Sequence, residues 1–155
     1  MPIPDFVVAL RERIGTMSLW LPGVTAVVLR DTEVLLVRRA DNGQWTPVTG
    51  IIDPGEEPAV AAVREVLEEA CVVATAERLV WVSAGKTILH ANGDRGQYLD
   101  HTFRCSWVSG EPAVGDDESV DARWFPLDDL PEMTPRNSQR IAYAVENRPE
   151  AHFAR

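Results

Sequence analysis

The chain has 155 residues, 45% of them hydrophobic, which fits one globular domain with a substantial core. Asp and Glu number 24 against 15 Lys and Arg, and the net charge of −9 argues against binding to a nucleic-acid polymer or to an anionic membrane surface. An anionic small molecule is still compatible with this charge if metal ions neutralise its site. Cys71 and Cys105 form no disulfide pattern, and neither a signal peptide nor a membrane-spanning apolar run is found, so a cytoplasmic protein with reduced thiols is expected.

The N-terminal part is expected to form a short amphipathic helix over residues 4–14, ended by Gly15. Its apolar face packs either on its own domain or on a second copy of the chain, which leaves a homodimer open. We therefore divide a single domain into an N-terminal helix and connector (1–22), a core (23–147) and a loose tail (148–155).

Two strands are predicted next, over residues 23–30 and 33–39, joined as a hairpin. Both faces of these strands are largely apolar, so they should lie centrally in a sheet that is covered on two sides. Arg39 stands where the second strand leaves the core, and a short strand follows over residues 45–48.

A loop that turns into a helix follows, and the rest of the chain is organised around it. Pro54-Gly55 marks a turn, and Glu56 and Glu57 are expected in the first helical turn, where negative charge suits the helix dipole. Apolar residues then recur at steps of three and four, which predicts one apolar stripe made of Ala59, Val60, Val63, Val66, Leu67 and Ala70.

Three glutamates lie on the side of this helix opposite the predicted stripe, because Glu65, Glu68 and Glu69 have the spacing i, i+3, i+4. Like charges at this spacing repel by roughly 0.2–0.5 kcal/mol per exposed pair, and Arg64 offsets part of this by pairing with Glu68. Two interpretations fit these residues. They form either a solvated acidic face or a site for a divalent cation such as Mg²⁺, which takes carboxylate oxygens and substrate phosphates as ligands.

The full spacing from Gly50 to Val72 favours the cation site, because it reads G-x5-E-x7-R-E-V-x-E-E-x-C-V. This stretch resembles the Nudix box of the MutT-like Nudix hydrolase family, G-x5-E-x7-R-E-U-x-E-E-x-G-U, in which U is apolar. Cys71 stands where the box has glycine, so it must adopt a positive φ or let the helix end differently. Weaker resemblance extends over roughly residues 23 to 130.

The resemblance implies an α/β (α+β) fold, an α/β/α sandwich with a central mixed β-sheet flanked by helices. It also implies a hydrolase that depends on Mg²⁺ or Mn²⁺. In such an enzyme Glu65 and Glu69 would bind the metal directly, with Glu68 and the backbone carbonyl of Thr49 completing the set. The supporting residues implied are Arg64, which holds the glutamates, Glu56, which supports Arg64, and Gly50 and Arg39, which contact the substrate.

The elements expected after the box are a strand over residues 72–82, a loop over 83–96, a strand over 97–108, a strand over 120–126 and a helix over 138–147 with Ile141, Ala144 and Val145 inward. His101 shares a face with apolar residues of its strand, which is typical of a hydrogen-bonded core histidine. Members of the family that the box resembles often carry an acidic metal ligand or base about six positions before a tryptophan. Glu118 stands there, with Asp117 as its nearest competitor, so the catalytic base is either Glu65 or Glu118.

The resulting hypothesis is hydrolysis of a phosphoanhydride bond in a nucleoside diphosphate linked to another group, by a metal-activated water. A nucleoside triphosphate and a nucleotide-linked small molecule both fit, because residues 87–90 lack the proline or tyrosine that marks some subfamilies. The alternative is a non-catalytic nucleotide-binding or sensor module of the same fold. Such modules usually lose box glutamates, whereas all of them are present here.

Overall fold

The computed structural model describes residues 3–155, which form three helices and an eight-stranded sheet. No helix in this part of the chain is both long and apolar enough to cross a bilayer. In chain order, the elements are α1 (Asp5–Ile14), β1 (Leu19–Arg30), β2 (Glu33–Arg39), β3 (Trp45–Thr46), β4 (Val48–Ile51), α2 (Pro58–Ala70), β5 (Val73–Ala84), β6 (Ile88–Leu89), β7 (Arg95–Ser109), β8 (Ser119–Pro126) and α3 (Pro135–Glu146).

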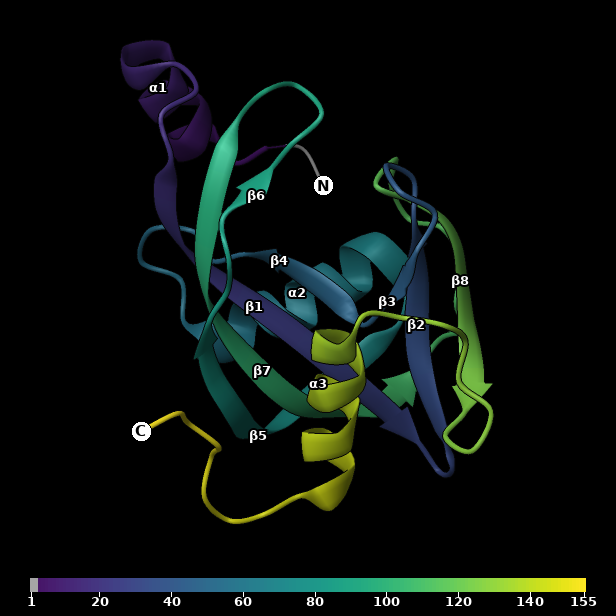
Figure 1. Ribbon diagram of the computed structural model, residues 1–155. Helices are drawn as coiled ribbons and strands as arrows, with labels where there is room; N and C mark the ends of the chain where they lie inside the picture. Colours follow the sequence, from purple (N-terminus) through teal and green to yellow (C-terminus); the bar gives the residue numbers. More distant parts are fainter. Residues whose placement is uncertain (1–2) are drawn as a thin grey trace.

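Strand β1 is the centre of the sheet (Figure 1). One of its edges pairs with β7 in a parallel ladder along almost its whole length. Its other edge is shared by two antiparallel partners, β4 along residues 23–26 and β2 at residues 29–30. Because β2 meets β1 only at this end, β2 and its partner β8 diverge from β7 and β5 (Figure 1).

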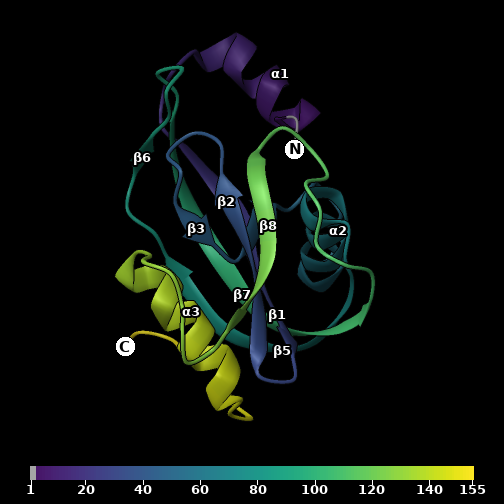
Figure 2. The ribbon, with the colours of Figure 1, turned by 90° about the vertical axis from the view of Figure 1, so that its right-hand side faces the viewer.

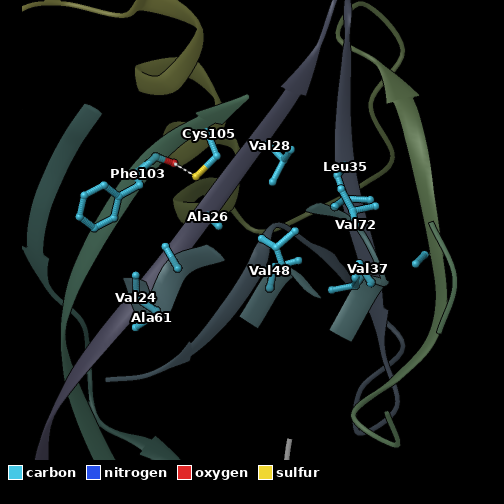
Figure 3. Close-up of a cluster of buried hydrophobic side chains, with 14 of the residues drawn as sticks. Val24, Ala26, Val28, Leu35, Val37, Val48, Ala61, Val72, Phe103 and Cys105 are labelled. Atoms are coloured by element: carbon cyan, nitrogen blue, oxygen red, sulfur yellow. Dashed lines mark hydrogen bonds between the residues drawn. The ribbon is translucent and has the colours of Figure 1, made fainter. Parts of the chain in front are cut away.

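Helices cover both faces of the sheet, with α2 on one side and α3 on the other (Figures 1 and 2). The core beneath α2 contains alternate residues of β1, among them Val24 and Val28, together with Leu35 and Phe103 (Figure 3). The intervening Val27 faces the second core, which Ile141 of α3 completes. This arrangement confirms the predicted sandwich with a mixed sheet, and it explains why the two central strands are apolar on both faces.

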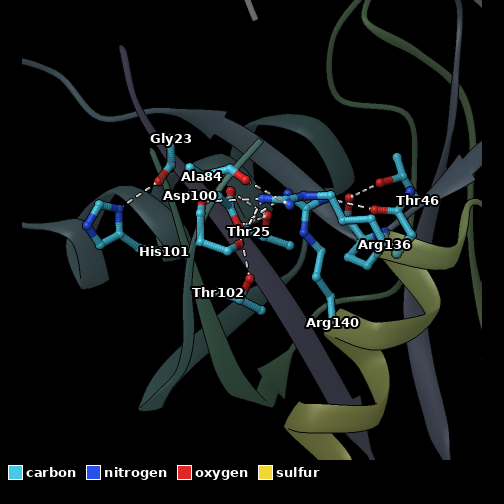
Figure 4. A network of polar contacts seen from close by, with 12 residues as sticks. Gly23, Thr25, Thr46, Ala84, Asp100, His101, Thr102, Arg136 and Arg140 are labelled. Atoms are coloured by element: carbon cyan, nitrogen blue, oxygen red, sulfur yellow. Dashed lines mark hydrogen bonds and ion pairs between the residues drawn. The ribbon is translucent and has the colours of Figure 1, made fainter. Parts of the chain in front are cut away.

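A buried polar network lies between the sheet and α3 (Figure 4). The carboxylate of Asp100 accepts hydrogen bonds from Thr25 Oγ1 at 2.9 Å and from Thr102 Oγ1 at 2.9 Å, and it pairs with Arg140 at 3.2 Å. Burial lowers the pKa of Arg140, and the Asp100 charge opposes this effect. His101 hydrogen-bonds through Nδ1 to the carbonyl of Gly23 at 3.0 Å, as expected for a core histidine.

Several boundaries differ from those predicted by the sequence. The expected connector is strand, because β1 begins at Leu19 and pairs there with β7. The tail was expected to be loose, but His152 bonds to the backbone of β5 and stacks on Tyr143 with ring centroids 3.6 Å apart. Helix α3 begins at Pro135 rather than at residue 138, and Val145, expected inward, is 46% exposed. The strand at Leu19 and the docked tail arise from contacts between distant segments, whereas α3 begins early for a local reason, because the Thr134 side chain caps it and accepts from the Asn137 amide.

Candidate metal centre

Helix α2 begins later than the charge pattern predicted. Pro58 is its first residue and Glu57 its N-cap, so Glu56 and Glu57 precede the first turn. Glu56 closes a turn instead, because its amide donates to the carbonyl of Asp53 at 3.0 Å and its carboxylate accepts from the Asp53 amide at 3.1 Å. The turn directs the Glu56 side chain toward the helix, where it meets Arg64.

The buried face of α2 matches the predicted apolar stripe only in part, because Val66 and Ala70 are buried as expected but other members of the stripe are not. Val60 and Leu67 were placed in that stripe, yet they are 55% and 53% exposed. Glu65 and Glu69, placed opposite it, are buried with exposed fractions of 0% and 4%. The buried face consists of Ala61, Ala62, Glu65, Val66, Glu69 and Ala70. The assumption that carboxylates face water therefore predicts the wrong orientation of α2 about its axis, because here two carboxylates face the sheet.

Glu65 lies directly against the backbone of Gly50 in β4. A Cβ atom at residue 50 would stand 2.2 Å from Glu65 Oε1, so only glycine fits beside this side chain. Glu65 Oε1 accepts from Arg64 Nη1 at 2.9 Å, whereas the buried Oε2 finds no hydrogen-bond partner among residues 3–155. Burial raises the pKa of Glu65 to about 7, and the nearby Arg64 charge opposes this shift. A buried carboxylate oxygen without a partner is a natural position for a cation ligand.

Arg64 joins three glutamates on and near the helix. Its Nε and Nη2 donate to the two oxygens of Glu56 at 2.7 and 2.9 Å, which lowers the pKa of the Glu56 carboxyl. Its Nη1 lies 2.9 Å from Glu65 and 3.2 Å from Glu68. The contacts with Glu56 raise the pKa of Arg64, so the guanidinium stays charged. The sequence predicted these partners, and their role in binding a metal stays a prediction.

The last turn of α2 meets the acidic segment that precedes β8. Burial raises the pKa of Glu69 to about 8, with a further contribution from the charge of Glu118. Glu118 is half-buried and burial raises its pKa as well, whereas its competitor Asp117 is exposed. Of these two acidic residues, Glu118 is therefore the one that is partly buried and close enough to Glu69 for their charges to interact.

Arg39 has a partner that the sequence analysis did not foresee. Its Nε and Nη2 donate to both oxygens of Asp41 at 2.9 and 2.7 Å. This pairing raises the pKa of Arg39, to which the charges of Glu118 and Glu69 also contribute. The i, i+2 spacing of Arg39 and Asp41 was the only local signal for the pair. A substrate phosphate would have to compete with Asp41 for this guanidinium.

The predicted ligands do not form a compact cluster. Across residues 3–155, no three His, Cys, Asp or Glu side chains converge as a ready metal site. Glu65 and Glu68 instead share the Arg64 guanidinium, and Thr49 lies in β4 opposite Thr25. Of the two alternatives for Cys71, the structure shows the positive φ, with φ 57° and ψ 24°. The Cys71 amide donates to the Leu67 carbonyl at 3.1 Å.

Comparison with known families decides how this arrangement is classified. A family model described as the NUDIX domain matches residues 20–145. The chain belongs to the Nudix domain family. Two relatives are NAD-capped RNA hydrolases NudC, from Pseudomonas syringae pv. syringae (strain B728a) at 30% identity over 131 residues and from Pseudomonas aeruginosa (strain LESB58) at 33% over 124 residues. The matches cover 81% and 76% of this Nudix chain, which spans only 42% and 40% of those proteins.

Solved Nudix structures have the same fold. A Nudix hydrolase from Nitrosomonas europaea has 30% sequence identity and a TM-score of 0.66, covering 83% of this chain and 90% of its own. A MutT Nudix hydrolase from Burkholderia pseudomallei has 28% identity and a TM-score of 0.61, covering 81% of this chain and 98% of its own. The sandwich described above is therefore the Nudix fold.

Proposed function

We propose that this Nudix domain hydrolyses a phosphoanhydride bond in a nucleoside diphosphate linked to another group, in a reaction that depends on Mg²⁺ or Mn²⁺. The observation that carries the proposal is the buried Oε2 of Glu65, which lies beside the backbone of Gly50 and has no hydrogen-bond partner in the described part of the chain. Leaving such an oxygen unpaired is costly, and coordination to a divalent cation would remove that cost. A residue kept only for packing would not require this arrangement.

The residues assigned to hold the ion are Glu65, Glu68 and Glu69, the carbonyl of Thr49, and Glu118. A divalent ion, when bound, neutralises phosphate oxygens and lowers the pKa of water. Arg64 orients Glu65 and Glu68 through one nitrogen, because Glu56 occupies its Nε and accepts from its Nη2. Removing Glu56 would therefore disturb the carboxylates without touching the substrate.

Glu65 and Glu118 both stay candidates for the base that takes a proton from the attacking water. Burial raises the pKa of each carboxyl, and a raised pKa suits a group that exchanges protons near neutral pH. Arg39 is proposed to bind a substrate phosphate after exchanging Asp41 for it, since a phosphate offers the same two-oxygen geometry with more charge. Gly50 is proposed to contact the substrate through its backbone, because Glu65 fills the space beside its Cα.

The test is a substrate panel with the purified chain. Nucleoside triphosphates, nucleotide sugars and NAD are incubated with Mg²⁺, with Mn²⁺ or with a chelator, and the products are identified. We expect at least one substrate to yield a nucleoside monophosphate only when a divalent ion is present. Binding of the same compounds without any product would refute hydrolysis and support the sensor module instead.

A capped RNA end is a second candidate substrate, because the curated relatives are named as NAD-capped RNA hydrolases. The net charge of −9 disfavours contact with a polymer of phosphates. Comparing kcat/KM for NAD and for an NAD-capped RNA separates the two candidates. A higher value for the capped RNA would overturn the expectation that the substrate is a small molecule.

A further inference from the structure

The acidic loop, defined as residues 110–118, is fastened to the C-terminal end of α2. The amide of Gly115 donates to the carbonyl of Glu69 at 3.0 Å, and the amide of Ala113 donates to the carbonyl of Ala70 at 3.0 Å. These two bonds satisfy carbonyls that a helix end otherwise leaves without a partner. The backbone of the loop therefore crosses the helix at Glu69, which is one of the proposed metal ligands.

Gly115 is the point of closest approach between the loop and the helix. A Cβ atom built on it would stand 1.9 Å from the carbonyl oxygen of Glu68 and 3.3 Å from Cys71 Sγ. The φ angle of Gly115 is not positive, so glycine is required here by space and not by backbone conformation. The obstructing atom belongs to the helix backbone, which cannot rotate away as a side chain can. Any larger residue must therefore lift the loop from the helix.

Glu118 depends on this contact for its position. It stands three positions after Gly115 in the sequence, and three residue steps span at most about 11 Å. Two further bonds fix the segment, because the Glu118 amide donates to Asp116 Oδ1 at 3.0 Å and the Glu118 carbonyl accepts from the Ala40 amide at 2.8 Å. The Glu118 backbone is thus held between the end of β2 and the end of α2.

We propose that Gly115 is a positioning residue, which holds the acidic loop on α2 so that Glu118 joins Glu69 as a ligand of the metal site. The inference rests on the proposed metal-dependent function, and it assigns to that site a residue outside the box helix. Gly115 itself touches neither metal nor substrate. It acts only through the distance between the loop and the helix.

The test is a double-mutant cycle on Mn²⁺ affinity, measured by titration calorimetry on the full chain without nucleotide. Gly115→Ala and Glu118→Gln should each weaken Mn²⁺ binding, by roughly 10–100-fold, the range found when the support of a metal ligand is lost. The double variant should bind no more weakly than either single variant, because both changes remove the same interaction. The matched control is Val114→Ala, in the same loop, whose side chain is 46% exposed and which should keep wild-type affinity.

Losses that add in the double variant, or a Gly115→Ala variant that unfolds more easily yet binds Mn²⁺ normally, would overturn the inference. If Gly115→Ala fails to fold, Ala113→Pro removes the other bond between loop and helix without crowding Glu68, and it should weaken Mn²⁺ binding likewise. Normal Mn²⁺ binding by that variant would also refute the inference. If the wild-type chain binds Mn²⁺ but cleaves no nucleotide, the proposed hydrolysis is refuted and the positioning role of Gly115 is not. The failure of the proposed function can therefore be told from the failure of this inference.

Discussion

Gly50→Ala is the most informative single change, because it adds one methyl group where β4 meets Glu65 of α2. The new Cβ would stand 2.2 Å from both Cδ and Oε1 of Glu65, whereas ordinary contacts begin at 3.4 Å. The carboxylate must therefore withdraw by about 1.2 Å, the difference between these distances, if the strand stays in place. Gly50 pairs with Val24 in the middle of the β1–β4 ladder, so the strand itself has little freedom to yield.

Two magnitudes follow from this displacement. Overpacking a buried site costs about 1–3 kcal/mol of the free energy of unfolding. A misplacement of about 1 Å at a catalytic group lowers turnover by roughly 100-fold. Turnover should thus fall well beyond what the modest loss of stability explains, since a variant with that loss stays folded at room temperature.

The assay measures kcat on the best substrate of the panel and the free energy of unfolding in urea. The matched control is Gly85→Ala, where the nearest atom to the new Cβ is the Tyr98 carbonyl oxygen at 3.7 Å, an ordinary contact. We expect the control to keep both the wild-type free energy of unfolding and the wild-type kcat. A Gly50→Ala variant with wild-type turnover would refute the view that Glu65 is held against the strand for catalysis.

Three further predictions concern the helix that carries the box. Glu69→Gln should lower turnover by orders of magnitude with little loss of fold, whereas the exposed Glu57→Gln should not; equal activity of the two variants would remove Glu69 from the metal site. In the folded chain burial raises the pKa of Glu65 to about 7 and that of Glu69 to about 8, well above the ordinary value of a glutamate in an unfolded chain. The stability that these two carboxyls contribute is therefore fully present below the unfolded pKa and is lost as pH rises through their folded pKa values. The metal-free chain should thus unfold at a lower urea concentration at pH 8 than at pH 5. Saturating Mn²⁺ should reduce this difference, because it binds the folded chain. A metal-free stability that rises over this interval would contradict the burial of these carboxyls. Cys71→Gly should raise the free energy of unfolding by up to about 1 kcal/mol, because it removes the strain of a left-handed non-glycine residue; a lower stability by thermal and urea unfolding would show that the cysteine side chain contributes contacts of its own.

The features that were predicted correctly depend on interactions between residues close together in the sequence. The box helix and the hairpin of β1 and β2 follow from spacing along the chain, and so does the pairing of Arg64 with Glu68, since residues four apart on a helix are neighbours wherever the helix lies. The contact of Arg64 with Glu56, which precedes the helix, was implied only by the resemblance to the Nudix box. The turn at Gly55, with φ 84°, is equally local, because glycine adopts that angle freely. For Cys71 the sequence left two alternatives, a positive φ or a different end to the helix, and the structure shows the positive φ.

What spacing could not decide is which side of the box helix faces the sheet. The apolar count placed Val60 and Leu67 inward and Glu65 outward, and the reverse is found, because Gly50 on a different strand leaves room for a buried carboxylate. Arg39 was predicted to stand at a strand end and, by the resemblance, to contact the substrate, and only the structure reveals that a phosphate would compete with Asp41 for its guanidinium.

Short spacings along the chain were enough to predict the motif, the helix that carries it and the hairpin before it, because these features depend on neighbouring residues. Spacing gave no sign that Glu65 lies against Gly50 or that the acidic loop lies on the end of α2 at Gly115. Both are contacts between backbones or buried groups far apart in sequence, and their stability depends on the space left between elements. That space is fixed only when the whole sheet has formed.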